Sequence, residues 1–116
     1  AENRLSGLLS EFPAEADLWP ALLPVVADES QWDVAECWRG TDGSGQLRRT
    51  SVWVRPGAGA ETFARDSAGW TFFAGDGLPG LAWRAGDPVW MPDLRSETNF
   101  KRKELALACG LNCGVA

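Results

Sequence analysis

Glycine and proline recur so closely in GDGLPGLAWRAGDPVWMPDL, residues 75–94, that only short helices and strands fit in this segment. Pro79 suits the first turn of a helix, where the amide hydrogen that proline lacks would have no helical partner. Gly86 suits the end of the same helix, because glycine adopts left-handed backbone angles at little cost. We therefore expect one or two helical turns over residues 78–85 and a short strand over residues 88–91.

Three glycines of this segment, Gly75, Gly77 and Gly80, have the superficial look of a phosphate-binding loop. Their spacing matches neither the pattern GxGxxG after a buried strand nor a loop that ends in Gly-Lys-Ser/Thr. No lysine lies close by in the sequence to meet a phosphate. We interpret these glycines as turn residues, since glycine tolerates positive φ angles.

The region from residue 32 to residue 55 has the pattern of a β-hairpin. Residues 32–39 alternate in character, with one side formed by Trp32, Val34, Glu36 and Trp38. The segment TDGSG at 41–45 has the composition of a turn, and residues 47–55 end in the β-rich run Val52-Trp53-Val54. Two such runs around a glycine-rich turn predict antiparallel strands.

Helical periodicity precedes the hairpin. One apolar face is formed by Leu5, Leu8, Leu9 and Phe12. A second helical run covers residues 14–28 and contains Pro20 and Pro24, which cannot donate helical hydrogen bonds. We expect a kink near Pro24, or a helix that begins close to Pro20.

Short elements alternate after the hairpin. We expect helices over residues 61–68 and 100–109, the second with Asn99 as its N-cap and Gly110 at its end. Residues 71–73 and 111–116 have the composition of extended segments. This order of elements predicts an α+β domain with a mostly antiparallel sheet.

The composition excludes several kinds of chemistry and of partner. The chain has no histidine, which excludes a Ser-His-Asp or Cys-His nucleophile, a His-ligated haem and any His-containing zinc site. Sixteen acidic residues against eleven basic ones give a net charge of −5, and the basic run 101–103 is followed directly by Glu104. A nucleic-acid-binding module usually carries a basic stripe, so we expect no nucleic-acid partner.

Length, hydropathy and cysteine content indicate one cytoplasmic domain. The chain has 116 residues, of which 45% are apolar. It has no apolar run of the roughly 20 residues that a bilayer requires, so we expect no membrane insertion. The first residues, AENRLSGLL, lack the basic and apolar regions of a signal peptide. Three cysteines, an odd number, favour reduced thiols over a disulfide framework.

Four segments together resemble a GAF domain of the bacterial signalling type, as found in multi-sensor histidine kinases and cyclic-di-GMP enzymes. They are SVWVRP (51–56), the segment 75–94, NFKR (99–102) and GLNCGVA (110–116). The resemblance implies a GAF-like, PAS-related central antiparallel sheet with flanking helices. It divides the chain into an N-terminal helix at 1–15, for dimerisation or linkage, and a sensor domain at 16–116 that stops before the family's last strands.

The resemblance also implies a function. Such a module binds a small molecule or relays a signal to an output domain, forms a homodimer through its terminal helices, and is not an enzyme. A ligand-free dimerisation or protein-interaction module is the alternative. A thiol-based redox sensor or enzyme is a third reading, which depends on Cys109 and Cys113.

The residues that the resemblance places near a ligand pocket are Trp53, Phe73, Trp83, Trp90, Asp93, Phe100 and Arg102. Asp93 and Arg102 are expected at the pocket mouth, where they either contact a ligand or cap the turn and pair with each other. The resemblance names no particular cofactor. Covalent bilin attachment is disfavoured because Gly110, not a histidine, follows Cys109. We expect the cysteines to pack as small apolar side chains.

Overall fold

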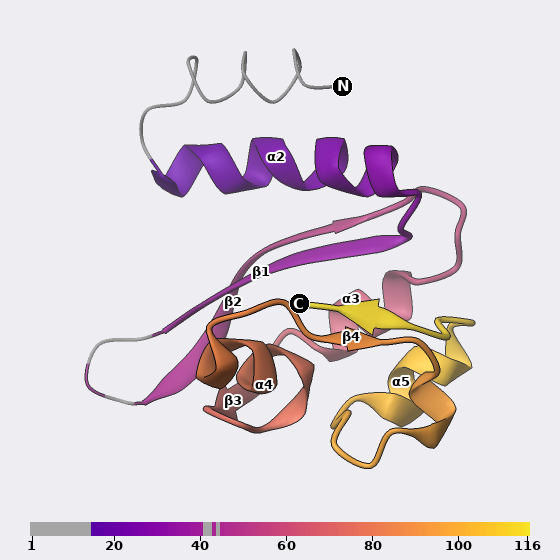
Figure 1. Cartoon of the computed structure of the whole chain (residues 1–116). Helices are drawn as coiled ribbons and strands as arrows, with labels where there is room; N and C mark the ends of the chain where they lie inside the picture. Colours follow the sequence, from indigo (N-terminus) through magenta and orange to yellow (C-terminus); the bar gives the residue numbers. More distant parts are fainter. Residues whose placement is uncertain (1–14, 41–42, 44) are drawn as a thin grey trace.

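A computed structural model describes residues 15–40, 43 and 45–116 (Figure 1). The elements in chain order are α2 (Glu15–Ser30), β1 (Val34–Gly40), β2 (Gln46–Val54), α3 (Glu61–Asp66), β3 (Thr71–Phe73), α4 (Gly77–Ala85), β4 (Trp90–Met91), the 3-10 helix η1 (Leu94–Ser96), α5 (Lys103–Ala108) and β5 (Gly114–Val115). The predicted apolar stripe of Leu5, Leu8, Leu9 and Phe12 lies outside the described residues.

Strands β1 and β2 form the predicted antiparallel hairpin. Their register runs from Val34 opposite Val54 to Gly40 opposite Leu47, with a shift between Cys37 and Trp38. Strand β3 pairs with the other side of β2, so the order in the sheet is β1-β2-β3. In the described part of the chain, β1 is therefore an edge strand.

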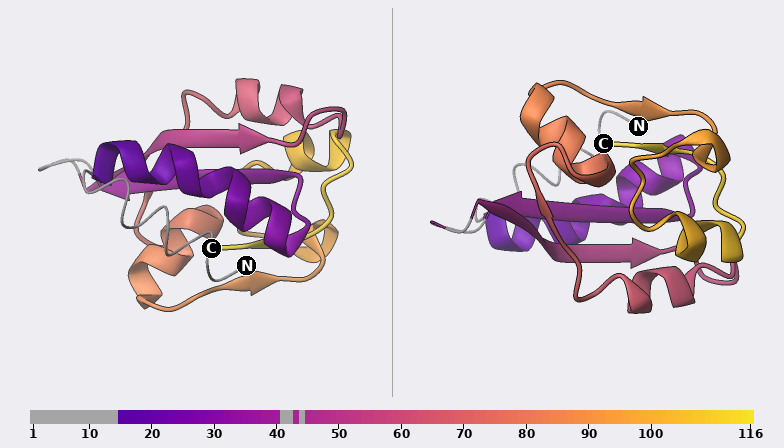
Figure 2. Two further views of the ribbon diagram at one scale, coloured as in Figure 1. Left: turned by 90° about the horizontal axis from the view of Figure 1, so that it is seen from above. Right: turned by 90° about the horizontal axis from the view of Figure 1, so that it is seen from below.

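Helix α2 lies on one face of this sheet and crosses β1 and β2 diagonally (Figure 2). It passes through Pro20 and Pro24 without interruption, so the expectation of a helix that begins near Pro20 is wrong. Its buried face, Leu22, Leu23, Val25 and Ala27, packs against the sheet. Burial of this apolar face offsets the two hydrogen bonds that the prolines remove.

The remaining helices and the second sheet lie on the opposite face (Figure 1). Their core contains Phe63, Leu78, Met91, Leu94, Phe100 and Ala106. Strand β4 pairs with β5, Trp90 opposite Val115 and Met91 opposite Gly114. The extended segments predicted at 88–91 and 111–116 are thus present, but each contributes only two residues of strand.

The glycine-rich segment forms the predicted turn and helix. Gly75 and Gly77 have φ angles of 89° and 61°, which confirms the positive φ expected of them. Gly80 has no positive φ and lies inside α4, so the prediction that it is a turn residue is wrong. A Cβ atom at Gly80 would collide with the carbonyl oxygen of Phe73. Helix α4 has Pro79 in its first turn and ends at Gly86, whose φ is 69°.

The predicted start of the last helix is wrong. Helix α5 begins at Lys103, three residues after the expected start, and Asn99 is not its N-cap. Instead the Asn99 side chain accepts a hydrogen bond from Gly77 N (3.0 Å) and donates one to Gly75 O (2.9 Å). The turn backbone therefore uses both polar atoms of this amide. The predicted end at Gly110 agrees with its φ of 78° after the C-cap Cys109.

Candidate functional site

A cavity of about 550 Å³ lies along β1, between α2 and the C-terminal segment. Its size falls within the range of roughly 300–1,000 Å³ that is typical of small-molecule sites. Leu23 and Val26 of α2 form one wall, and Leu78 of α4 and Leu111 belong to another. The cavity is therefore built where the sheet, a helix from each face and the last residues of the chain meet.

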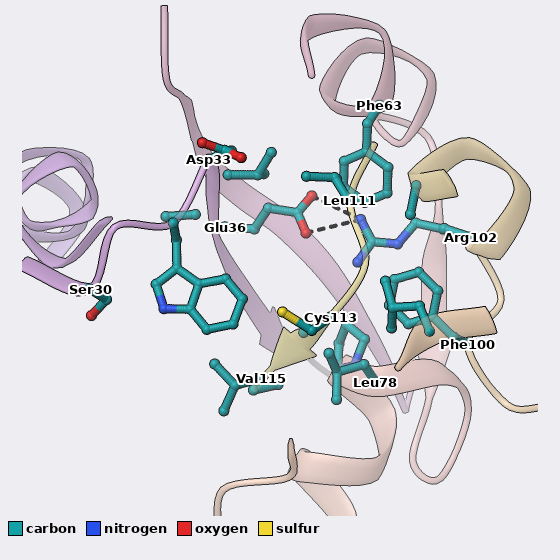
Figure 3. Close-up of a pocket in the computed structure, with 18 of the residues that line it drawn as sticks. Ser30, Asp33, Glu36, Phe63, Leu78, Phe100, Arg102, Leu111, Cys113 and Val115 are labelled. Carbon is teal, nitrogen blue, oxygen red and sulfur yellow. Dashed lines mark hydrogen bonds and ion pairs between the residues drawn. The ribbon is translucent and has the colours of Figure 1, made fainter. Parts of the chain in front are cut away.

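Glu36 of β1 is the centre of a buried charged cluster on this cavity (Figure 3). Arg102 Nη1 donates to both carboxylate oxygens of Glu36, at 2.9 Å each. Arg49 Nη1 on β2 donates to Glu36 Oε2 at 3.1 Å, and the indole N–H of Trp38 donates to Oε1 at 3.3 Å. The side chains of Glu36 and Arg49 are each 10% exposed, and that of Arg102 is 4% exposed. One carboxylate thus faces two guanidinium groups.

Aromatic rings surround the guanidinium of Arg102. Its central carbon lies 4.8–5.7 Å from the ring centroids of Phe63, Trp38, Phe72 and Phe100. Burial lowers the pKa of Arg102, while the Glu36 carboxylate opposes that change. An arginine remains charged even after such a decrease, so the cavity contains a fixed positive group held by a carboxylate and by ring faces.

Secondary structure explains how these residues meet. Alternation along β1 directs Val34, Glu36 and Trp38 to the same side of the sheet, where all three line the cavity. Arg102 lies immediately before α5, and its carbonyl oxygen accepts a hydrogen bond from Ala106 N at 2.9 Å. The start of α5 therefore holds the backbone of Arg102 in place.

Of the residues predicted near a ligand, Phe100 and Arg102 line this cavity, whereas Trp53, Phe73, Trp83, Trp90 and Asp93 do not. Phe73, Trp83 and Trp90 are more than 40% exposed. Trp53 lies on β2 under the guanidinium of Arg55, 5.3 Å from it, and Trp90 packs edge-on against Trp32, a cavity residue. The structure thus brings together two of the seven predicted residues.

The expected pairing of Asp93 with Arg102 is wrong. Asp93 Oδ1 accepts hydrogen bonds from Arg95 N (3.1 Å) and Arg95 Nε (3.2 Å), and these bonds lower the pKa of Asp93. Asp93 therefore caps η1, and the partner of Arg102 is Glu36. Glu36 was not among the predicted site residues. Its position in the alternating series, an acid on the same side as Trp32 and Trp38, was the signal that could have identified it, since unpaired acids are seldom buried.

The three cysteines are free and half-buried. Cys113 lines the cavity and Cys109 does not. Over residues 15–40, 43 and 45–116, no group of three or more His, Cys, Asp or Glu side chains could hold a metal ion. Among the same residues, no helix is long and apolar enough to cross a membrane.

Two solved structures share this architecture. The GAF domain of the phosphoenolpyruvate-protein phosphotransferase from Acinetobacter superposes with a TM-score of 0.63 and 14% identity, over 84% of this chain and 60% of that chain. The corresponding domain from Coxiella burnetii superposes with a TM-score of 0.65 and 17% identity, over 90% and 60%. The chain has the fold of a GAF domain.

The α+β class and the antiparallel sheet expected from the sequence are therefore confirmed. This chain spans 60% of the length of both GAF structures. No protein-family model and no curated protein matches its sequence. In this GAF-like fold, the cavity lined by the Glu36–Arg102 pair is the candidate ligand site.

Proposed function

We propose that this chain is a regulatory GAF module of a bacterial signal-transduction protein, such as a histidine kinase or a cyclic-di-GMP enzyme. In this proposal it binds a small molecule in the cavity along β1, does not catalyse a reaction, and transmits occupancy to an output domain. The cavity that contains the buried Glu36–Arg102 pair carries the proposal. Its apolar walls would exclude water, and a few buried polar groups would orient a ligand.

Helix α2 connects the cavity to the surface of the module. Leu23 and Val26 on α2 line the cavity, so an occupant would contact this helix directly. At the C-terminal end of α2, Arg55 donates to Asp28 Oδ1 (3.2 Å) and to the carbonyl oxygen of Trp32 (3.0 Å). The helix is thereby fastened to the sheet at one end. A ligand that favours one position of α2 would shift the population of that arrangement.

Native and denaturing mass spectrometry of the purified protein, with an absorption spectrum, tests this proposal. We expect additional mass that is present only in the native spectrum. Val26→Trp should remove it, because Val26 lines the cavity, is 44% exposed and can accept a larger side chain. Val52→Trp is the matched control, since Val52 is 38% exposed and does not line the cavity. Equal retention of the added mass in both variants would contradict a ligand in this cavity.

A ligand-free dimerisation or interaction module is the second candidate. Exposed apolar side chains favour it, among them Trp19, Val26, Trp90 and Val115, which are 37–54% exposed. We propose that any homodimer uses the terminal helices, through the stripe of Leu5, Leu8, Leu9 and Phe12. Sedimentation of the double variant Leu8→Glu, Leu9→Glu tests this interface, and a dimer that survives both changes would exclude it.

A further inference from the structure

The charged cluster on the cavity has unequal numbers of positive and negative groups. Arg102 and Arg49 each carry a positive charge, and the single carboxylate of Glu36 serves both. All three side chains are at most 10% exposed. Because a buried charge without compensation raises the free energy of a protein, this cluster favours the arrival of one further negative charge.

Arg102 also has unused hydrogen-bond donors. Both of its bonds to Glu36 come from Nη1, and no described residue accepts a hydrogen bond from its Nη2 or Nε. In the described part of the chain, Ser67 Oγ is the one fully enclosed side-chain polar atom without a partner. Nη2 and Nε of Arg102 have no partner among the described residues and are not among the fully enclosed atoms, so both remain accessible. Arg102 also lines the cavity. Figure 3 shows its guanidinium directed inward, between Glu36 and Phe100.

The other residues that line the cavity determine what kind of molecule could carry this negative charge into it. Apolar side chains predominate among the residues that line the cavity, including Leu23, Val34, Phe63, Leu78, Leu94 and Leu111. The other acid that lines the cavity, Asp33, is 48% exposed and is paired with Arg55 Nε at 3.4 Å. A ligand with several charges would leave some of them against apolar walls, at a large desolvation cost.

We propose that the ligand of this cavity is a monocarboxylate with an apolar body, and that Nη2 and Nε of Arg102 bind its carboxylate. This inference rests on the proposed function, because it names the ligand class of the same site. The bound state would place two carboxylates against two guanidinium groups, which balances the charges of the cluster. Arg102 would then bridge the ligand and Glu36, and a planar guanidinium has the geometry for two such partners.

Two compounds of nearly the same shape test the charge requirement. 3-Phenylpropionate is ionised at pH 7, and 3-phenylpropionamide is its neutral counterpart. Calorimetric titration and ligand-observed NMR should show that the wild-type protein binds the acid at least about tenfold more tightly than the amide, the gain expected of a charge-assisted hydrogen bond. In Arg102→Met the acid should lose this advantage, while the affinity for the amide stays within about threefold.

Arg49→Met is the matched control. It removes the same charge from the same carboxylate, but Arg49 does not line the cavity. The preference for the acid should fall only in part in this variant, because the excess positive charge is gone but the hydrogen bonds from Arg102 to the ligand remain. If Arg102→Met does not fold, Glu36→Gln combined with Arg49→Met and Arg102→Met removes all three charges of the cluster and should likewise bind the two compounds equally.

The outcomes separate this inference from the function on which it rests. Equal affinity for acid and amide in the wild-type protein would overturn the monocarboxylate assignment and leave the cavity as a ligand site. Equal loss of preference in Arg49→Met and Arg102→Met would overturn the contact with Arg102. Failure of both compounds to bind at millimolar concentration would count against ligand binding in the cavity, and against this inference with it.

Discussion

Arg102 Nη1 lies 2.9 Å from each carboxylate oxygen of Glu36, although the two residues are 66 positions apart in the chain. This bond joins the residue before α5 to the middle of β1. It therefore ties the second half of the domain to the hairpin, and does so inside a cage of aromatic rings. The same pair lines the cavity that we propose as the ligand site.

Replacement of both members of this pair should cost less than the two single replacements added together. Glu36→Leu leaves Arg102 and Arg49 charged and buried, and we expect the free energy of unfolding to fall by about 3–5 kcal/mol. Glu36→Leu combined with Arg102→Leu should cost clearly less than the sum of the two single variants, because each single variant leaves one member of the pair without the other and the double variant does not. Urea denaturation of the two single variants and the double variant measures the difference. Additive losses would show that the two side chains do not interact.

Gly80 should not tolerate a side chain. A Cβ atom there would collide with the carbonyl oxygen of Phe73, and backbone must move to relieve the contact. We expect Gly80→Ala to lower the free energy of unfolding by about 1–3 kcal/mol, as other overpacked positions do. Gly69→Ala is the control, since Gly69 has open space around it and no positive φ. Thermal unfolding of the two variants compares them, and similar melting temperatures would refute the close packing at Gly80.

The Asn99 side chain should stabilise the turn that precedes α4. Asn99→Ala removes hydrogen bonds to Gly77 N and Gly75 O, and we expect a loss of about 1–2 kcal/mol. Hydrogen exchange at the Gly77 amide should accelerate in this variant, because its acceptor is gone. Asn112→Ala, at an exposed position, should leave this exchange rate unchanged. An unaltered rate in Asn99→Ala would contradict the bond.

Alkylation should distinguish the two C-terminal cysteines. Both are half-buried, so iodoacetamide should label them more slowly in the native than in the denatured protein. 3-Phenylpropionate at saturating concentration should slow labelling of Cys113, which lines the cavity, and leave Cys109 unaffected. Peptide mass spectrometry gives the rate at each site. Fast labelling of both thiols in the native protein would instead favour the redox-sensor reading.

The cap of η1 should make a small contribution to acid sensitivity. The hydrogen bonds from Arg95 lower the pKa of Asp93 in the folded protein below its value in the unfolded chain. The stabilisation is therefore fully present above the unfolded pKa of about 3.9, and is lost as the pH falls through the folded pKa. Asp93→Asn should reduce stability slightly at pH 7, and its difference from the wild type should shrink as the pH falls through the folded pKa of Asp93. A difference that persists unchanged at pH 2 would exclude this ionisation as the cause.

Local patterns were sufficient to predict most of the elements. The alternation at 32–39 and the turn composition at 41–45 predicted the hairpin. Pro79 and Gly86 predicted the limits of α4. Both predictions were possible because these signals depend on the backbone preferences of neighbouring residues. Asn99 misled the prediction of α5 because its amide can bond to any nearby backbone group. Only the folded chain brings the turn at Gly75 and Gly77 within its reach.

The sequence by itself determined that this protein has an antiparallel hairpin, short helices bounded by proline and glycine, and no histidine-dependent chemistry. Tertiary structure decided that Arg102 pairs with Glu36 and not with Asp93. The reason is physical: a local pattern specifies φ and ψ angles and which side of a strand a residue occupies. The partner of a buried charge depends on which distant segments pack together, and here the packing of α5 against α3 and η1 places Arg102 beside Glu36.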